Sequence, residues 1–453
     1  MKLWMDVMRT LEPVLADHER LFDAWNAGGV DGLVIGPLLF DQPKLYPGIR
    51  WETGRTPHAT FDPDPAVYRR FGVEPPPAPP AAPEQRRLLE QTLTAAKDRG
   101  WSVWIFQASA GTGPGGDGHI FADERTQAAV CARMVDTLAH YPMVDGTIMD
   151  GPEWGYEIAP HHMNYRSYIF NDLPATVKPA CQRLGYEYEQ LVAAKDRLYD
   201  HLHALQPKQI RLHAAGGLVG ALRLLGGDPD LAAWLQFRVE SLTTFFRTVR
   251  TALTSELGAG VKLGVGPRTA AFAPLCGYDF AFLAEFMDLL LPKHYFFQRG
   301  FDGLLGTVYR YIETLTAWNP GLRDQEALAV VQALFGLTLP GVSTRADCED
   351  ALTPTFFADV VTQETKRALA VVDDPNRIVP WVDAGRAPHD GDPMTAGQLR
   401  HLLLAAQQAG LQRFLYHHQG NLTPGEWAVM SELCGTTWQP LTSAYQPPDE
   451  FVL

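Results

Sequence analysis

The sequence predicts an α/β fold, a (β/α)8 barrel in which eight parallel strands close into a ring covered by helices. Two observations favour it. Eight short β-rich runs alternate with helical patterns, and 453 residues with 46% hydrophobic content can bury one large core. An open doubly wound sheet is the alternative, but it more often binds a nucleotide at a glycine-rich first turn, whereas the first strand here ends in DVMRT. We expect one barrel over residues 1–435 and a C-terminal tail at 436–453.

Each strand candidate is a short run rich in aliphatic, β-branched or aromatic residues. Helix-like stretches between them, such as EQRRLLEQTLTAAKDRG and MTAGQLRHLLLAAQQAG, end in a glycine that can stop a helix just before the next strand. Repeated strand-helix units favour the barrel because closure removes exposed sheet edges. The runs are KLWMDVM (2–8), DGLVIGP (31–37), WSVWIFQAS (101–109), VDGTIMD (144–150), VKLGVGP (261–267), DLLLPKHYF (288–296), RIVPWVDAG (377–385) and RFLYHHQ (413–419).

Long insertions interrupt these units near residues 38–85, 158–260 and 298–376. In a barrel, such insertions are expected at the carboxyl-terminal face, where the active site lies. The first insertion contains EPPPAPPAAPE, a stiff polyproline segment that we interpret as a surface strut in preference to a domain linker. The second and third are predicted to be helical, and this includes the apolar stretch IRLHAA (210–215).

Composition and charge narrow the classes of partner. The net charge of −14 is spread along the chain without a run of Lys or Arg, so nucleic acid is not an expected partner. No stretch reaches the roughly 18 to 20 apolar residues of a membrane helix, and MKLWMDVMRTLEPVL does not look like a secretion signal. Five scattered cysteines argue against a disulfide framework. These features predict a cytoplasmic protein without a membrane partner and leave a homo-oligomer open.

Polar residues gather where the predicted strands end, which is where barrel enzymes carry out their chemistry. In VDGTIMDGPEWGYE, Asp150 ends the fourth strand, and a Gly-Pro turn leads into further acidic and aromatic residues. Other strand ends add a mixture of carboxylates, imidazoles, cations and aromatics. The predicted site therefore comprises Asp6, Asp150, Glu153, Trp154, Tyr156, Glu157, Arg268, Lys293, His294, Tyr295, Trp381, Asp383, His417 and Asn421.

This mixture suits a carbohydrate substrate, because carboxylates can serve as acid, base or nucleophile while aromatic rings stack on sugar C–H surfaces. Glycoside cleavage needs two carboxyl groups in different protonation states, and mutual repulsion is one way to separate their pKa values. We expect His417 to bond to substrate and Asp6 and Glu157 to line the pocket. Aromatic stacking is assigned to Trp154, Tyr156, Tyr295 and Trp381, and the holding of hydroxyls or an anionic substituent to Arg268, Lys293, His294 and Asn421.

The order of several motifs resembles one known family. The succession DGLVIGPLLFDQPKLYPG, RGWSVWIF, VDGTIMDGPEW and FRVESLTTFFRTVRTAL, leading into VKLGVGP, is similar to that of the family-10-like glycosyl hydrolase-like barrel proteins. The resemblance covers roughly residues 1–420 and implies a barrel that acts on glycans or derives from enzymes that do. It places Asp150 on the family's acidic residue at the end of strand four and Arg238 on its helical arginine. The chain departs from the family at PEWGYE and in the long insertion before strand five.

A looser analogy with barrel glycosidases suggests catalytic roles, since these enzymes often carry the acid on strand four and the nucleophile on strand seven. Glu153 or Asp150 would then be the proton donor, and Asp383 the nucleophile or base. A carboxyl separation of ~5 Å would predict retention of configuration, and one of ~6.5 to 9.5 Å inversion. A structural alternative is that Asp150 caps its turn or pairs with Lys293 or Arg268.

We predict no organic cofactor and no metal site. His417-His418 and His161-His162 are adjacent pairs, and neighbouring side chains on a strand point in opposite directions, so each pair offers at most one ligand. The stretch GTGPGGDG (111–118) matches G-x-G-x-x-G, but its proline and the late start of the next helix indicate a loop. Two other functions stay open: a noncatalytic glycan-binding barrel, and a metal-dependent barrel hydrolase or lyase whose activity a chelator would abolish.

Overall fold

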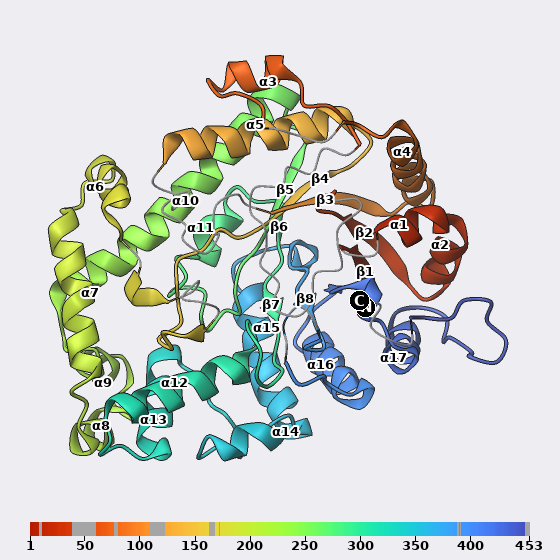
Figure 1. The fold of residues 1–453 in the computed structure, drawn as a ribbon. Helices are drawn as coiled ribbons and strands as arrows, with labels where there is room; N and C mark the ends of the chain where they lie inside the picture. Colours follow the sequence, from red (N-terminus) through yellow and green to blue (C-terminus); the bar gives the residue numbers. More distant parts are fainter. Residues whose placement is uncertain are drawn as a thin grey trace.

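The chain folds into the predicted α/β barrel, as seen in a computed structural model (Figure 1). All strand pairs in the sheet are parallel, and each of the eight predicted runs overlaps at least one strand. The strands are β1 (Lys2–Val7), β2 (Val30–Ile35), β3 (Ser102–Ala108), β4 (Gly146–Asp150), β5 (Lys262–Gly266), β6 (Leu289–Leu290), β7 (Lys293–His294), β8 (Trp381–Val382) and β9 (Arg413–Tyr416).

The structure describes residues 1–8, 11–38, 60–76, 80–108, 123–162, 168–171, 173–386, 389 and 391–448. The glycine-rich stretch 111–118, part of the polyproline segment and half of the insertion near 38–85 lie outside these residues. The predictions made for those stretches stay predictions.

The ring closes through residues 289–294, which form β6 and β7 within a single predicted strand. On one edge of this segment, the Leu291 N–H donates to the Val265 carbonyl at 2.8 Å and joins β5. On the other edge, the Trp381 N–H donates to the Pro292 carbonyl at 3.0 Å, and β7 pairs with β8. Proline has no N–H to give to this second edge, so the ladder is interrupted there. The nine labelled strands therefore make an eight-strand ring with a break in the sixth.

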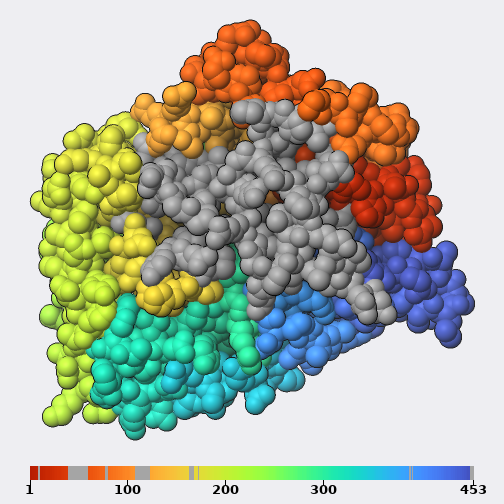
Figure 2. Space-filling view, in the orientation of Figure 1, coloured from red at the N-terminus to blue at the C-terminus, as the bar shows by residue number. Residues whose placement is uncertain are grey.

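Helices surround the ring on its outside (Figure 1), and the orange segment that includes α3 and the yellow-green segment that includes α7 lie at the rim of the space-filling view (Figure 2). Among the described residues, no helix combines the length and the apolar character needed to cross a membrane. The helices are α1 (Leu11–Ala16), α2 (His18–Ala27), α3 (Pro65–Arg70), α4 (Pro83–Asp98), α5 (Glu124–His140), α6 (Lys178–Arg183), α7 (Tyr188–Leu202), α8 (Pro207–His213), α9 (Gly217–Leu224), α10 (Pro229–Leu257), α11 (Phe280–Ala284), α12 (Leu304–Trp318), α13 (Asp324–Phe335), α14 (Pro354–Phe356), α15 (Thr362–Leu369), α16 (Ala396–Gln408) and α17 (Pro424–Cys434).

Local sequence explains where several helices start. Helix α10 begins at a proline in its first turn, and the Asp228 side chain caps it by accepting a hydrogen bond from the Asp230 N–H at 2.9 Å. Helices α16 and α17 each begin with a capping box, formed in α17 by Thr423 and Glu426. The stretch IRLHAA (210–215) is helical as far as the end of α8, as predicted.

Large aromatic side chains fill the barrel, and glycines on neighbouring strands make room for them. Trp4 contacts Trp104 across the first strands at a centroid distance of 6.1 Å, and both indoles are buried. A Cβ on Gly32 would lie 2.4 Å from the Trp4 ring, and one on Gly266 would lie 2.5 Å from the Trp381 ring. The barrel is therefore a packed core, and polar chemistry is confined to the end of the strands above these rings.

Candidate active site

Asp150 stands at the end of β4, where it is level with the last residues of β3 and β5. Its Oδ1 atom lies 3.2 Å from the Lys293 ammonium, which reaches it from β7. The Asp150 side chain is 28% exposed, whereas that of Lys293 is 7% exposed. The strand-four carboxylate is therefore anchored by a buried cation on one side and open to solvent on the other.

Glu153 belongs to a second, more enclosed ion pair just after the Gly-Pro turn. Both of its carboxylate oxygens accept hydrogen bonds from Arg268, with Nε to Oε2 at 2.7 Å. The Arg268 guanidinium also contacts Asp302 and lies over the Tyr156 ring, 4.8 Å from its centroid. Such two-point contacts fix both partners in one orientation. Both carboxylate oxygens of Glu153 are therefore occupied by hydrogen bonds to Arg268.

Asp302 links the two pairs, because it contacts Arg268 through Oδ1 and lies 3.4 Å from the Lys293 ammonium through Oδ2. The Tyr156 hydroxyl also donates to Oδ1 at 3.2 Å. Burial opposes ionisation of this carboxyl, but the charges of Arg268 and Lys293 outweigh burial and lower the pKa of Asp302 well below its ordinary value. Burial and Arg268 lower the pKa of Lys293, yet Asp150 and Asp302 outweigh them and raise it. Asp302 and Lys293 therefore form a charged pair near neutral pH.

Each acidic residue of the crowded stretch after β4 has its own cation. Asp150 pairs with Lys293 and Glu153 with Arg268, while Glu157 is buried and accepts a hydrogen bond from Arg310 Nε at 2.9 Å. The like charges were expected to repel one another inside a shared pocket. The structure shows instead that each of these carboxylates contacts a different cation, and these contacts offset the repulsion.

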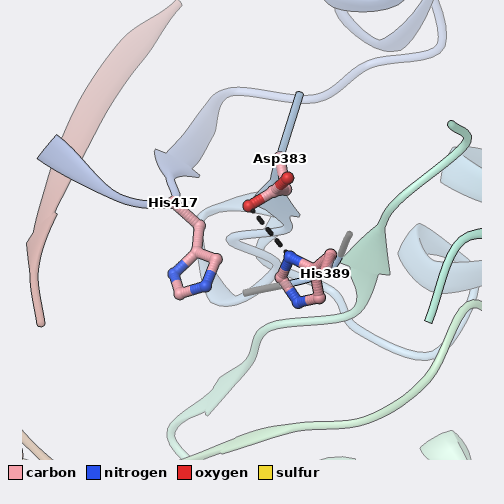
Figure 3. A group of neighbouring side chains, drawn as sticks. All are labelled: Asp383, His389 and His417. Carbon is pink, nitrogen blue, oxygen red and sulfur yellow. Dashed lines mark ion pairs between the residues drawn. The ribbon is translucent and has the colours of Figure 1, made fainter. Parts of the chain in front are cut away.

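A second polar group forms at the ends of β1, β8 and β9 (Figure 3). His417 Nδ1 lies 2.5 Å from Asp6 Oδ2 in a fully buried pair. His389, in the loop after β8, places Nδ1 3.3 Å from Asp383 Oδ2, and the other oxygen of Asp383 accepts the Gly385 N–H at 2.5 Å. Burial lowers the pKa of His389 even though Asp383 acts in the opposite direction. Two carboxylates and two imidazoles thus meet on this side of the ring.

The two polar groups are connected through Asp302. Its Oδ2 atom lies 4.0 Å from His389 Nε2, so an unbroken series of contacts runs from Asp150 through Lys293, Asp302 and His389 to Asp383. The strands that carry Asp150 and Asp383 are three positions apart in the ring. Barrel closure therefore brings these two predicted carboxylates into one network.

The four aromatic side chains predicted to stack on a sugar do not present an open face. Trp154 is 0% exposed, Tyr156 2%, Tyr295 1% and Trp381 1%. The rings pack against neighbours instead: Tyr295, for example, lies between His389 and His417, at centroid distances of 4.8 and 6.1 Å. The structure contradicts the predicted stacking role because these aromatics are enclosed by the core and the ion pairs.

Trp154 is enclosed by the long helix α10. Its Nε1–H lies 3.1 Å from both the Arg238 carbonyl and the Ser241 hydroxyl. Arg238, the position that the family resemblance singled out, is fully buried and donates to the Gly155 carbonyl. This arginine therefore holds the loop after β4 against α10, away from the polar groups of the site.

His294 points away from the site, which corrects its predicted role in substrate binding. Successive side chains on a strand face opposite sides, so Lys293 and Tyr295 point inward while His294 points toward the helices. Its Nε2 atom lies 3.0 Å from the Thr365 hydroxyl on α15. Burial lowers the pKa of His294 to about 3. Asn421 is also buried, just beyond β9, and its backbone carbonyl accepts a hydrogen bond from the Arg386 guanidinium at 3.4 Å.

Two residues of the network, Asp302 and His389, were not anticipated from the sequence. Both lie in loops that follow strands of the ring, and loop residues show no regular spacing or periodicity that would identify them as site residues. The one available signal was their short distance in sequence from a strand end, since Asp302 follows Lys293 by nine residues and His389 follows Asp383 by six. Asp302 has φ 70°, a left-handed conformation that is uncommon outside glycine but tolerated by Asp.

Comparisons with known proteins leave the family open. No protein-family model and no curated protein sequence matches the chain. The glycoside hydrolase domain of PgaB (BpsB) from Bordetella bronchiseptica is similar in structure, with 12% identity, a TM-score of 0.48, and coverage of 95% of this chain and 99% of that one. A chitinase (RmChi1) from Rhizomucor miehei gives 12% identity, a TM-score of 0.40, and coverage of 96% and 100%. The catalytic domain of a β-amylase from Paenibacillus polymyxa gives 11% identity and a TM-score of 0.44, and the match covers 97% of this chain and 99% of that one.

All three of these solved structures are named as carbohydrate-cleaving enzymes or domains. At such identities and TM-scores the similarity defines neither a family nor a function for this chain. The family-10-like resemblance stays a prediction from the sequence.

Proposed function

We propose that this chain hydrolyses a glycosidic bond, as the family-10-like resemblance implies for a barrel of this kind, and that Asp150 is the proton donor, a role suggested by the looser analogy with barrel glycosidases. One observation carries the proposal: Asp150 is the most exposed carboxylate of a network that spans the ring. Its side chain is 28% exposed, against 16% for Glu153, 7% for Asp302 and 1% for Asp383. A proton donor must reach the leaving oxygen, and Asp150 is the acid best placed to do so.

The sequence left the choice between Asp150 and Glu153 open. Both oxygens of Glu153 are engaged by Arg268, so we assign this carboxylate to positioning the arginine. Asp150 contacts Lys293 through the single atom Oδ1, and its side chain is 28% exposed, so a substrate can reach this carboxyl group. These contacts support Asp150 as the donor.

Asp383 is the proposed base on the other wall. It is flanked by His389 and His417, so this wall can take a proton from a water that attacks the anomeric carbon. The transition state would carry oxocarbenium character, as in other glycoside hydrolyses by paired carboxylates. In this scheme Asp150 gives its proton to the leaving oxygen, and water supplies the new bond.

The charges of the site favour a neutral sugar over an acidic one. Lys293 and Arg268 were candidates for binding an anionic substituent, but both already contact carboxylates. Two cations face three anions here: Asp150, Glu153 and Asp302. An anionic substrate would meet this excess of negative charge, so we propose a neutral glycan fragment or glycoside. The cytoplasmic location and the homo-oligomer remain predictions from the sequence.

A panel of neutral and uronic-acid oligosaccharides, with product masses read by mass spectrometry, tests the function and the substrate class together. We expect products that differ from a neutral substrate by the addition of one water. The Asp150→Asn variant should lose about 10²- to 10⁴-fold in kcat, the usual contribution of a positioned proton donor.

Asp359→Asn is the matched control, because Asp359 is an exposed carboxylate in the helical layer. This variant should keep full activity. Binding of an oligosaccharide without any product would favour the noncatalytic glycan-binding barrel. Full activity of Asp150→Asn on a substrate that the wild type cleaves would refute the proposed role of Asp150.

A further inference from the structure

Asp383, His389 and His417 form a compact group of metal-ligand type at the ends of β8 and β9 (Figure 3). One ligand atom of each residue can be chosen so that all three lie within 4.8 Å of one another. In the tetrahedral geometry that zinc prefers, two ligands at about 2.0 to 2.2 Å from the metal stand about 3.3 to 3.6 Å apart. Binding would therefore need the most widely separated ligand atoms to move closer by up to about 1.5 Å.

Two atoms of this group are buried without a hydrogen bond. Asp383 Oδ2 and His389 Nδ1 face each other at 3.3 Å, but neither has a hydrogen-bond partner of acceptable geometry within the described residues. The two residues are 0% and 4% exposed. Buried polar atoms are nearly always satisfied in native proteins, so an unsatisfied pair that converges on one point requires an explanation. An ion between them would satisfy both.

The surroundings supply the outer partners that metal-binding histidines usually have. A ligating histidine typically donates a hydrogen bond from its second ring nitrogen to a carboxylate. This bond fixes the ring and makes the ligating nitrogen more basic. His417 Nδ1 lies 2.5 Å from Asp6 Oδ2, which leaves Nε2 for an ion. His389 Nε2 faces Asp302 Oδ2 at 4.0 Å, which leaves Nδ1. His417 therefore has a hydrogen-bonded carboxylate behind it, and His389 has a carboxylate at 4.0 Å on the corresponding side of its ring.

We propose that Asp383, His389 and His417 bind one divalent transition-metal ion of the Zn²⁺ or Mn²⁺ class. Two imidazoles and one carboxylate suit such ions, and three protein ligands leave at least one coordination position for water or substrate. Calcium is disfavoured because it prefers six to eight oxygen ligands. The sequence did not suggest this site because His389 is remote from the paired histidines that were considered for metal binding.

Ion binding does not depend on glycoside cleavage, but it would refine the proposed function where both hold. Asp383 would then act as a ligand, and a water on the ion would become the attacking group. A bound zinc ion can lower the pKa of such a water to about 7. The balance of the reaction is unchanged: Asp150 gives its proton to the leaving oxygen, the water adds hydroxide to the anomeric carbon, and its released proton restores Asp150 through solvent.

Calorimetric titration of chelator-treated protein with ZnCl2 and, separately, MnCl2 tests the proposal without any substrate. We expect one ion per chain with at least one of the two metals. His389→Ala and Asp383→Asn should each weaken binding by more than 100-fold. Asp6→Asn should weaken it about 10- to 100-fold, because Asp6 acts only through His417. Thermal unfolding in chelator identifies any variant that fails to fold, in which case the Asp6 variant decides.

His401→Ala is the matched control, since His401 is an exposed histidine on α16. Its affinity for the ion should equal that of the wild type. The proposal is overturned if the folded wild type binds neither ion, or if the variants of the group bind as tightly as the His401 variant. Absence of glycosidase activity would count against the proposed function and would leave this titration unaffected.

Discussion

At the scale of single residues, Asp302 holds the site together. It contacts Arg268, lies 3.4 Å from the Lys293 ammonium, and accepts a hydrogen bond from Tyr156. These contacts are almost completely buried, so removing one charge leaves the others without full compensation. The left-handed backbone of Asp302 costs free energy that only strong surrounding contacts can offset.

Asp302→Asn should therefore lower the free energy of unfolding by about 3 to 5 kcal/mol at pH 7, the usual effect of breaking a buried ion pair. Because the folded pKa of Asp302 is lowered, its contribution is present above the unfolded pKa of about 3.9 and is lost as the pH falls through the folded value. Urea unfolding followed by circular dichroism measures the change. Asp359→Asn should stay within about 0.5 kcal/mol of wild type, and an equally small effect of Asp302→Asn would contradict the central position of this residue.

At the scale of secondary-structure elements, strand alternation decides which residues reach the site. In β7 and the residue after it, Lys293 and Tyr295 face inward while His294 faces α15. A run of three polar residues in the sequence looked like three site residues, although a strand can turn only alternate ones toward the same side. The strand ends could therefore be located from the sequence, but the prediction did not take into account which side of the strand each side chain faces.

The outward position of His294 has a consequence for stability against pH. A buried histidine with a pKa of about 3 stays neutral in the folded chain, whereas it binds a proton below about 6.5 in the unfolded chain. The unfolded state thus binds more protons between these values, and His294 makes stability fall as the pH falls. His294→Gln should remove about 2 kcal/mol of the loss between pH 7 and pH 5.

Urea unfolding at the two pH values measures this difference. Glutamine can keep a hydrogen bond to Thr365, so the comparison isolates the titration of the ring. The exposed His401→Gln variant should show the same pH dependence as the wild type. An identical dependence for His294→Gln would show that His294 is not held neutral.

Packing inside the barrel is a second property of the strands. Gly266 ends β5 directly beneath Trp381, and a Cβ there would lie 2.5 Å from the indole ring. Gly266→Ala should cost about 1 to 3 kcal/mol, because the tightly packed interior must shift to accept the methyl group. Gly260→Ala is the control, since its Cβ would meet nothing within 4 Å. Comparable stability of the two variants, measured by urea unfolding, would mean that the barrel interior is looser than described.

At the scale of the whole molecule, closure of the ring is what makes one site out of distant residues. Asp6 and His417 are 411 residues apart in sequence and 2.5 Å apart in space. The eight strand runs could be predicted because buried parallel strands are continuous apolar segments, and their ends located Asp150, Lys293, Asp383 and His417. The local sequence pattern was therefore sufficient to locate the strands and the polar residues at their ends.

The rest of the site could not be predicted because it depends on contacts that local pattern does not encode. Asp302 and His389 enter through loops, whose paths have no periodicity. Trp154 looked like a mouth-lining aromatic, yet the long insertion that carries α10 covers it. The ion-pair partners of Glu153 and Glu157 likewise come from segments 115 and 153 residues away.

The measurement that tests the central claim most directly is a comparison of kcat for the wild type, Asp150→Asn, Asp383→Asn and the double variant on the substrate found in the panel. Two groups that act on one bond behave as a unit, so their effects are not additive. We predict that each single variant loses at least about 10²-fold and that the double variant is about as active as the weaker single one. Full activity in either single variant, or a double variant that falls by the product of the two losses, would contradict a shared site.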